Sequence, residues 1–282
     1  MSKKMTHCIF CLENKYEKNN KSHILPESAC NEDMILPEGF ECNDCNQRFS
    51  KIEQKVIRSF PGQLFRVMGV EKTKRGKIPT SDVCGGKLKR MDGGERPTIQ
   101  ILGHSKSKNT PTLEIKNDKH VIKWETIKIV PSEISAFLAR IALSYFCIQS
   151  KNVYSSEYEN LRTCANSLGM KEFIPFLVGV NASSNQEIKL LSDNNDLVTR
   201  TVPVSVKFPG FFGLLPTASG IDLTDITELK TYLYGKFKTH CFAVPDPSWN
   251  KPIAFQLELT PMSDIAQKCH EKILKEGKRK FP

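Results

Sequence analysis

The sequence has 282 residues, which is long enough for two domains or for one small module beside a domain of ordinary size. Hydrophobic residues make up 39% of it and charged residues 26%, so a real core can form. No apolar run approaches the roughly 18 residues that a membrane-spanning helix needs, and the N-terminal MSKKMTHC lacks the apolar core of an export signal. We therefore expect a cytosolic protein without a membrane partner.

The net charge is +10, and the excess of basic residues is concentrated in two segments. Residues 51–90 carry 11 basic and 3 acidic side chains, and residues 268–282 carry 6 basic and 2 acidic ones. Clustered lysine and arginine, with a sequence pI near 9.0, are expected of a protein that binds a polyanion such as nucleic acid. A solvated lysine-rich surface without a partner is the alternative.

Ten cysteines are many for a reducing compartment, where disulfides are rare and paired cysteines more often bind metal. Two CxxC pairs, Cys8 with Cys11 and Cys42 with Cys45, have 30 residues between them. Each pair places two thiolates on one tight turn, so the two turns complete a tetrahedral sulfur site that suits structural zinc. An iron–sulfur or redox role is the alternative, but nothing else in the sequence indicates electron transfer. The other cysteines are expected to be small buried or neutral residues: Cys30, Cys84, Cys147, Cys164, Cys241 and Cys269.

Residues 1–62 are expected to form a module that zinc holds together, because so short a segment cannot bury enough apolar surface unaided. Two turn-prone arms, NKYEKNNKS and NEDMILPEG, lie between the two cysteine pairs. Residues 43–60 have the periodicity of an amphipathic helix, and Pro61 ends the run. The apolar residues at helical spacing are Phe49, Ile52, Val56 and Phe60.

The segment CIFCLEN…SHILPESACNEDMILPEGFECNDCNQRF resembles the HNH, or ββα-metal, endonuclease family. It is similar to the branch that reads CxxC, then a His-Ile/Val-Ile/Leu-Pro turn, then CxxCN ahead of a helix. The resemblance covers about fifty residues and is faint in the rest of the chain. It implies a small zinc-stapled ββα-metal HNH module over these residues. The strand and helix patterns of the rest of the chain predict a larger α+β domain after it.

The resemblance also implies which residues carry the chemistry. His23 would be the general base that takes a proton from water, which suits a side chain that titrates near neutral pH. Asn46 would be a ligand of a catalytic divalent cation, Mg²⁺ or another, near the start of the helix. For His23, the alternatives are a buried hydrogen-bonding residue or a spare zinc ligand, and Asn46 is alternatively a helix cap.

Two positions depart from the family pattern. Most members place an acidic residue directly before the catalytic histidine, and here that residue is Ser22. The central asparagine of the pattern has no clear counterpart in ILPEGFE. The nearby carboxylates of Glu27, Glu41 and Asp44 are candidate substitutes.

Residues 63–95 are predicted to be a basic connector that lines a phosphate track, with a solvated loop as the alternative. The candidate nucleic-acid-binding residues are Lys72, Lys74, Arg75, Lys77, Lys87, Lys89 and Arg90. Residues 96–267 are predicted to form the α+β domain, with a role in recognition or regulation, and residues 268–282 a basic tail.

Within the α+β domain, three short strands come first, in the segments PTIQILG, TLEIK and HVIKWETIKIV. Two helices follow. The first, residues 131–150, has one apolar stripe, and the second, residues 155–169, would be capped by Gly169. Further strand-like segments are EIKLL, LVTRTVPVSVKF, THCFAV and PIAFQLEL. The stripe consists of Ile134, Phe137, Leu138, Ile141, Ala142 and Tyr145.

The sequence thus predicts a metal-dependent endonuclease that hydrolyses DNA phosphodiester bonds. The resemblance implies a link to restriction or anti-phage defence. It also implies one cut strand per module, so a homodimer is the simple way to break both strands. The alternative is a zinc-stapled nucleic-acid-binding protein in which the change at Ser22 has abolished catalysis.

Overall fold

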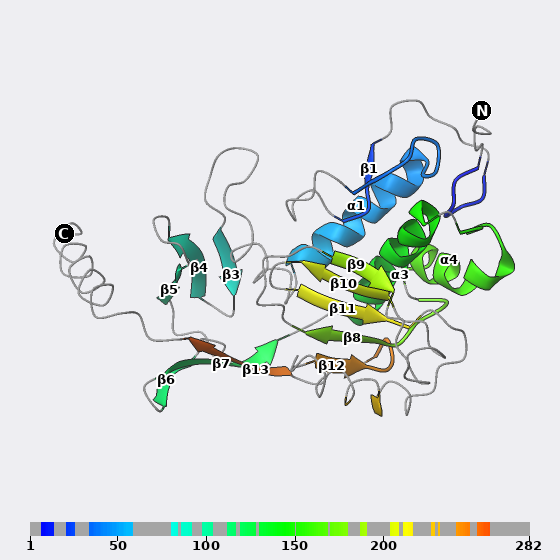
Figure 1. Cartoon of the computed structure of the whole chain (residues 1–282). Helices are drawn as coiled ribbons and strands as arrows, with labels where there is room; N and C mark the ends of the chain where they lie inside the picture. Colours follow the sequence, from blue (N-terminus) through cyan, green and yellow to red (C-terminus); the bar gives the residue numbers. More distant parts are fainter. Residues whose placement is uncertain are drawn as a thin grey trace. The chain divides into compact units, whose positions relative to one another are not determined.

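The computed structural model of the chain (Figure 1) describes residues 7–13, 21–25, 34–58, 80–83, 86–91, 98–103, 112–116, 119–127, 130–149, 151–168, 170–179, 187–190, 204–208, 211–216, 227–228, 231, 241–248 and 253–259. The chain divides into two compact units. The first consists of Met1–Val83, Lys87–Leu102 and Lys128–Lys251, and the second of Cys84–Gly86, Gly103–Ile127 and Pro252–Pro282. No helix in the described part of the chain has the length and apolar character to cross a membrane.

The N-terminal part of the first unit has the predicted ββα order. Strand β1 (Ser22–His23) pairs antiparallel with β2 (Ile35–Leu36), so that His23 lies opposite Ile35. A tight turn follows β2, in which the Phe40 N–H donates to the Pro37 carbonyl at 3.3 Å and Gly39 has a φ of 87°. Glycine suits this place because a side chain disfavours positive φ. Helix α1 (Asn43–Arg58) then begins one residue after Cys42.

The central helix α3 (Pro131–Ile148) is buried nearly all round. The predicted stripe residues are buried except for the half-buried Tyr145, but burial extends to every residue from Ile134 to Ser144 and so goes beyond one stripe. The physical reason is that α3 has neighbours on several sides: α1, α4 (Glu159–Asn166), and strands β10 (Val204–Phe208) and β11 (Phe211–Leu215) of one sheet. A helix that packs on several sides is apolar around its whole circumference.

The second predicted helix is shorter than expected. A 3-10 turn, η2 (Ser156–Tyr158), precedes α4, which ends at Asn166. The left-handed position after the helix is taken by Leu168, with a φ of 57°, and Gly169 lies outside the described residues. The helix therefore ends with Ser167 at the C-cap, and the left-handed residue after it is a leucine and not the predicted glycine.

The sheet of the first unit has five antiparallel strands in the order β12-β8-β11-β10-β9. These are β8 (Phe176–Gly179), β9 (Glu187–Leu190), β10, β11 and β12 (Cys241–Val244). Helix α3 packs on β10 and β11 (Figure 1). The segments of β9, β10 and β12 follow the sequence prediction, whereas β8 and β11 have no polar alternation to mark them. All four residues of β8 are buried, which explains the uniformly apolar run.

Two smaller sheets complete the described elements. One has the order β3-β4-β5, with β3 (Thr80–Val83), β4 (Gly86–Met91) and β5 (Thr98–Gly103). The other, within the second unit, is antiparallel with the order β13-β7-β6, from β6 (Thr112–Lys116), β7 (Lys119–Ile127) and β13 (Ile253–Leu259). The described elements thus confirm an α+β fold with antiparallel sheets. The predicted connector contains two strands, β3 and β4, and its limits remain a prediction.

One apolar core joins the N-terminal ββα segment to α3 and the five-stranded sheet. Phe10 and Phe49 are 1% exposed or less and meet edge to face, with ring centroids 4.6 Å apart. They belong to the same cluster of buried side chains as Phe137 of α3 and Val206 of β10. The ββα segment is therefore stabilised by packing against the α3 helix as well as by its cysteines.

We expect the Phe49→Ala substitution to lower the free energy of unfolding by about 3–5 kcal/mol, because it leaves a cavity in this shared core. Thermal or urea denaturation of the full chain would measure the change. Lys51→Ala, on the exposed side of the same helix, is the matched control and should stay within about 0.5 kcal/mol of wild type. Equal losses in the two variants would contradict a shared core at Phe49.

Candidate active site and metal centre

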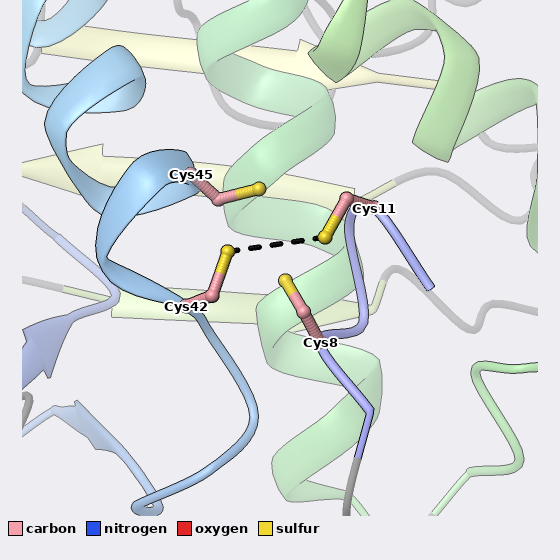
Figure 2. A group of neighbouring side chains, drawn as sticks. All are labelled: Cys8, Cys11, Cys42 and Cys45. Carbon is pink, nitrogen blue, oxygen red and sulfur yellow. Dashed lines mark hydrogen bonds between the residues drawn. The ribbon is translucent and has the colours of Figure 1, made fainter. Parts of the chain in front are cut away.

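The four paired cysteines form one cluster (Figure 2), with their Sγ atoms all within 4.8 Å of one another. Cys8 and Cys11 come from an N-terminal turn, whereas Cys42 precedes α1 and Cys45 lies in its first turn. The Sγ atoms of Cys11 and Cys42 are 3.8 Å apart. In the described part of the chain, this is the one group of three or more His, Cys, Asp or Glu side chains close enough to hold a metal ion.

Backbone hydrogen bonds shape both cysteine turns. In the first, the Leu12 N–H donates to the Cys8 carbonyl at 2.9 Å, and Leu12 takes a left-handed φ of 59°. In the second, the Asn46 N–H donates to the Cys42 carbonyl at 3.0 Å. The Ile9 N–H donates to the Phe40 carbonyl at 2.8 Å and thereby joins the two turns. The sulfur atoms are thus brought together by main-chain geometry, as a closed tetrahedral zinc site requires.

The thiols of the cluster interact strongly with one another. A hydrogen bond with Cys45, together with main-chain hydrogen bonds, lowers the pKa of Cys8 to about 5 in spite of its burial. The same hydrogen bond raises the pKa of Cys45, and burial raises the pKa of Cys11 to about 11. One thiolate shared among neighbouring thiols is a suitable starting point for a soft metal ion, which would displace the remaining protons on binding. The donor set therefore fits zinc.

Arg48 provides a positive charge beside this cluster. Its Nη2 donates to Cys45 Sγ at 3.2 Å and to Asn166 Oδ1 of α4 at 2.5 Å. Four thiolates around a zinc ion would leave two net negative charges, which an adjacent guanidinium partly offsets. The arginine therefore fits an outer-shell role at a zinc–thiolate centre.

Side chains from the α4 region hold the first cysteine turn by its main chain. Arg162 Nε donates to the Ile9 carbonyl at 3.0 Å, and Asn166 Nδ2 donates to the Phe10 carbonyl at 2.7 Å. Tyr154 Oη donates to the His7 carbonyl at 2.8 Å. The turn that carries Cys8 and Cys11 is thus fixed by residues far along the sequence, a contribution that the cysteine spacing does not reveal.

His23 lies at the end of β1 and is half-buried. Its Nδ1 atom is buried and has no hydrogen-bond partner among the described residues. Its side chain is also not part of the metal-binding cluster of the described residues, which argues against a role as a spare zinc ligand. The main chain of His23, in contrast, is tightly held. The ring therefore has one buried nitrogen that no described residue engages.

Asn46 is half-buried in the first turn of α1, three residues after the helix begins at Asn43. It is therefore not in the N-cap position, because that residue immediately precedes the first helical one. Its neighbour in the same turn, Asp44, is exposed. The amide of Asn46 and the carboxylate of Asp44 both lie near the positive end of the helix dipole.

Ser22 is committed to a buried polar network that centres on Arg140 of α3. The Ser22 hydroxyl donates to Glu41 Oε2 and accepts from Arg140 Nη2 at 3.1 Å. Arg140 Nη2 also contacts Glu41 Oε2 at 3.2 Å, and its Nη1 contacts Glu53 Oε1 of α1 at 2.6 Å. Ser22 and Glu41 are only 3% and 4% exposed. Ser22 Oγ and Glu41 Oε2 are therefore already hydrogen-bonded within this network.

The two carboxylates also account for the charge state of the network. Burial alone would lower the pKa of Arg140, but Glu41 and Glu53 outweigh that effect and raise it, so the guanidinium stays charged. Burial raises the pKa of Glu53, and the adjacent Arg140 opposes this shift. A charged group at this depth persists only when it is paired and hydrogen-bonded, as it is here.

Residues 8–61 match the family model described as HNH endonuclease. This segment is similar to HNH endonuclease modules, and we call it the HNH module. The match spans both cysteine pairs, β1, β2 and α1, so the family resemblance predicted from the sequence is confirmed over these residues. No curated protein and no solved structure shows significant similarity to the chain.

The other predicted site residues fall mostly outside the described part. Outside the described residues lie Glu27, the basic residues of the segment 72–77, and the basic tail. Phe60 and Pro61, at the end of the predicted helix, also lie outside them. Lys87, Lys89 and Arg90 lie on strand β4, which follows the HNH module in the sequence. Of the scattered cysteines, Cys147 and Cys164 are buried, as predicted, and Cys30, Cys84 and Cys269 lie outside the described residues. Cys241 lies on β12.

The residue that sequence reasoning missed is Arg140. It is the one charged residue between Ile134 and Cys147, in a stretch of helix that is otherwise uncharged. A helix that is apolar all round is buried, and a lone charge within it must find a partner. That signal would have identified Arg140 as a buried ion-pairing residue, but it could not have identified the HNH module as the place of its partners.

Proposed function

We propose that the chain is a metal-dependent endonuclease that hydrolyses DNA phosphodiester bonds, with His23 as the general base. The match of residues 8–61 to HNH endonucleases carries this proposal. The environment of His23 supports it, because the ring keeps a nitrogen without a partner among the described residues while the strand is fixed. A positioned histidine of this kind can take the proton of an attacking water.

Asn46 is the proposed protein ligand of the catalytic cation. Such a cation, when bound, would stabilise negative charge on the phosphate and its leaving oxygen. Apart from the four cysteines, the described residues bring together no group of three His, Cys, Asp or Glu side chains that could hold it, and Ser22 Oγ and Glu41 Oε2 are bound to Arg140. Magnesium sites commonly use one or two protein oxygens together with water and substrate phosphate. The proposal is therefore that most of the coordination comes with the DNA, at the N-terminal end of α1, where an anion is favoured.

The basic segments are the proposed contacts to the DNA backbone. Lys87, Lys89 and Arg90 occur together on β4, and residues 51–90 hold most of the net positive charge. Contacts to phosphates give affinity without sequence specificity, and they weaken as the salt concentration rises. A role in restriction or anti-phage defence is proposed on the family resemblance alone, and a homodimer is the proposed means of cutting both strands.

Incubation of the zinc-loaded full chain with supercoiled plasmid and Mg²⁺, Mn²⁺ or Ni²⁺ is expected to yield nicked or linear DNA. Agarose electrophoresis would separate the products, and a reaction with excess EDTA should leave the plasmid supercoiled. Linear product at low conversion would support paired modules, whereas accumulation of nicked circles would indicate single cuts. A protein that retards the plasmid in a gel and leaves it intact with every cation would overturn the nuclease proposal in favour of a binding protein.

A further inference from the structure

We infer that Arg140 is a positioning residue for His23: it holds strand β1 against α1 and so makes the catalytic geometry of the HNH module depend on helix α3. This inference rests on the proposed function, because it assigns a role to Arg140 in the reaction of His23. Arg140 lies outside the segment that matches the HNH family.

Arg140 contacts β1 mainly through the main chain. Its Nη2 donates to the carbonyl of His23 at 3.0 Å, and its Nη1 lies 3.4 Å from the carbonyl of Ile24. The same guanidinium contacts the hydroxyl of Ser22 at 3.1 Å. Three consecutive residues, with His23 in the middle, are thereby held by one side chain. Contacts to main-chain oxygens fix the place of the strand without using the imidazole of His23.

The strand needs such a support because its own pairing is minimal. Strands β1 and β2 have two residues each, and an isolated hairpin is at best marginally stable even at greater length. Among the described residues, one more hydrogen bond extends this pairing, from the Ile24 N–H to the Met34 carbonyl at 2.8 Å. The position of the His23 backbone therefore depends strongly on the contacts that α3 makes from outside the hairpin.

The guanidinium itself is held in place from three sides. Glu53 of α1 binds Nη1 at 2.6 Å, and Glu41, directly before Cys42, binds Nη2 at 3.2 Å. The ring of Phe49 lies 5.3 Å from the guanidinium carbon. The side chain of Arg140 is 2% exposed, so water does not compete for these bonds. Arg140 therefore connects β1, α1 and the second cysteine turn at a single point.

A lysine cannot reproduce this arrangement. The planar fork of arginine presents fixed donors to several acceptors at once, whereas the ammonium of lysine is a compact point charge. Arg140→Lys keeps the positive charge between Glu41 and Glu53 but cannot maintain the contacts to both carboxylates and the two carbonyls of β1. The substitution should therefore disturb position more than charge.

Arg162 provides the matched control. It is also a buried arginine from outside the HNH match, 3% exposed, and it also donates to a main-chain carbonyl of the module, that of Ile9 at 3.0 Å. The contacts of Arg162 are with the first cysteine turn, Glu159 and Val153, and none of its described contacts is with β1. Arg162→Lys therefore reproduces the general loss of stability on replacing a buried arginine, while the contacts of Arg140 to β1 stay intact.

The test compares wild type, Arg140→Lys and Arg162→Lys as full zinc-loaded chains, cleaving a duplex under conditions that separate kcat from KM. We expect Arg140→Lys to lower kcat by about 10- to 100-fold with KM within about threefold, since a displacement near 1 Å at a reacting group has effects of that order. Arg162→Lys, which leaves every described contact to β1 in place, should lower kcat at least about threefold less than Arg140→Lys does. Wild-type kcat in Arg140→Lys, or equal losses in both variants, would overturn the inference.

Two further measurements keep the inference testable. If Arg140→Lys does not fold, Glu53→Gln removes one ion pair of Arg140 and leaves its contacts to β1 possible. It should lower kcat several-fold at unchanged KM, and an unchanged kcat would overturn the inference.

If wild type itself does not cleave DNA, the proposed function fails. The Cε1–H resonance of His23, assigned by its loss in His23→Ala, then tests the position directly: Arg140→Lys should shift it and Arg162→Lys should not, whereas an unshifted signal in Arg140→Lys would overturn the inference.

Discussion

Replacement of Cys42 by serine is expected to abolish zinc binding and to unfold the HNH module. Cys42 is buried, and its Sγ lies 3.8 Å from that of Cys11 within the four-sulfur cluster. Structural zinc sites contribute about 10–16 kcal/mol of binding free energy that is also folding free energy. A site with three thiolates and one hydroxyl loses much of that. Zinc content by atomic absorption should fall from about one equivalent towards zero, and the melting transition should move to lower temperature.

The control for this prediction is Cys147→Ser, at a buried cysteine of α3 that is not part of the cluster. Burial raises the pKa of the Cys147 thiol to about 12, so this thiol stays neutral and is a poor metal ligand. Cys147→Ser should retain the zinc of the wild-type chain. A Cys42→Ser protein that still holds a full equivalent of zinc would contradict the four-cysteine site.

Replacement of His23 by alanine is expected to lower the rate of DNA cleavage by about 10²- to 10⁴-fold, the usual contribution of a general base. Because Arg140 binds the main chain of β1, the loss of the imidazole should leave the strand in place. Zinc content and melting temperature should therefore stay near their wild-type values. Single-turnover cleavage of an end-labelled duplex, with protein in excess, would measure the rate of the chemical step.

His7→Ala is the matched histidine control, since His7 is exposed and directly precedes the first cysteine turn. It should cleave at close to the wild-type rate. A His23→Ala protein whose cleavage rate stays within a fewfold of wild type would show that another group takes the proton. Loss of cleavage together with loss of zinc would instead indicate a structural role for His23.

The local features of the HNH module could be predicted from sequence because they depend on spacing. Two CxxC pairs give two thiolate turns whatever the rest of the chain does, and the apolar period of residues 43–60 gives the helix α1. The strands β6, β7 and β13 could be predicted for a similar reason. Apolar and polar residues alternate along them, so each segment carries its own signal.

Long-range packing could not be predicted in this way. Periodicity indicates that a helix has a buried face, but not which element covers it, so the contact of α3 with α1 had no signal in the sequence. Strand β8 was not predicted because all of its residues are buried, so apolar and polar residues do not alternate along it. The sequence marked Ser22 as a departure from the family pattern, yet only the structure shows that its hydroxyl is bound to Glu41 and Arg140.

We propose that the HNH module hydrolyses DNA through His23. The most direct measurement is the conversion of supercoiled plasmid to nicked or linear DNA by wild type and His23→Ala, both carrying one equivalent of zinc, with a divalent cation added. We predict cleavage by wild type and, over the same time, no more than about one hundredth of it by His23→Ala. Equal cleavage by the two proteins, or intact plasmid with wild type under every cation, would contradict the claim.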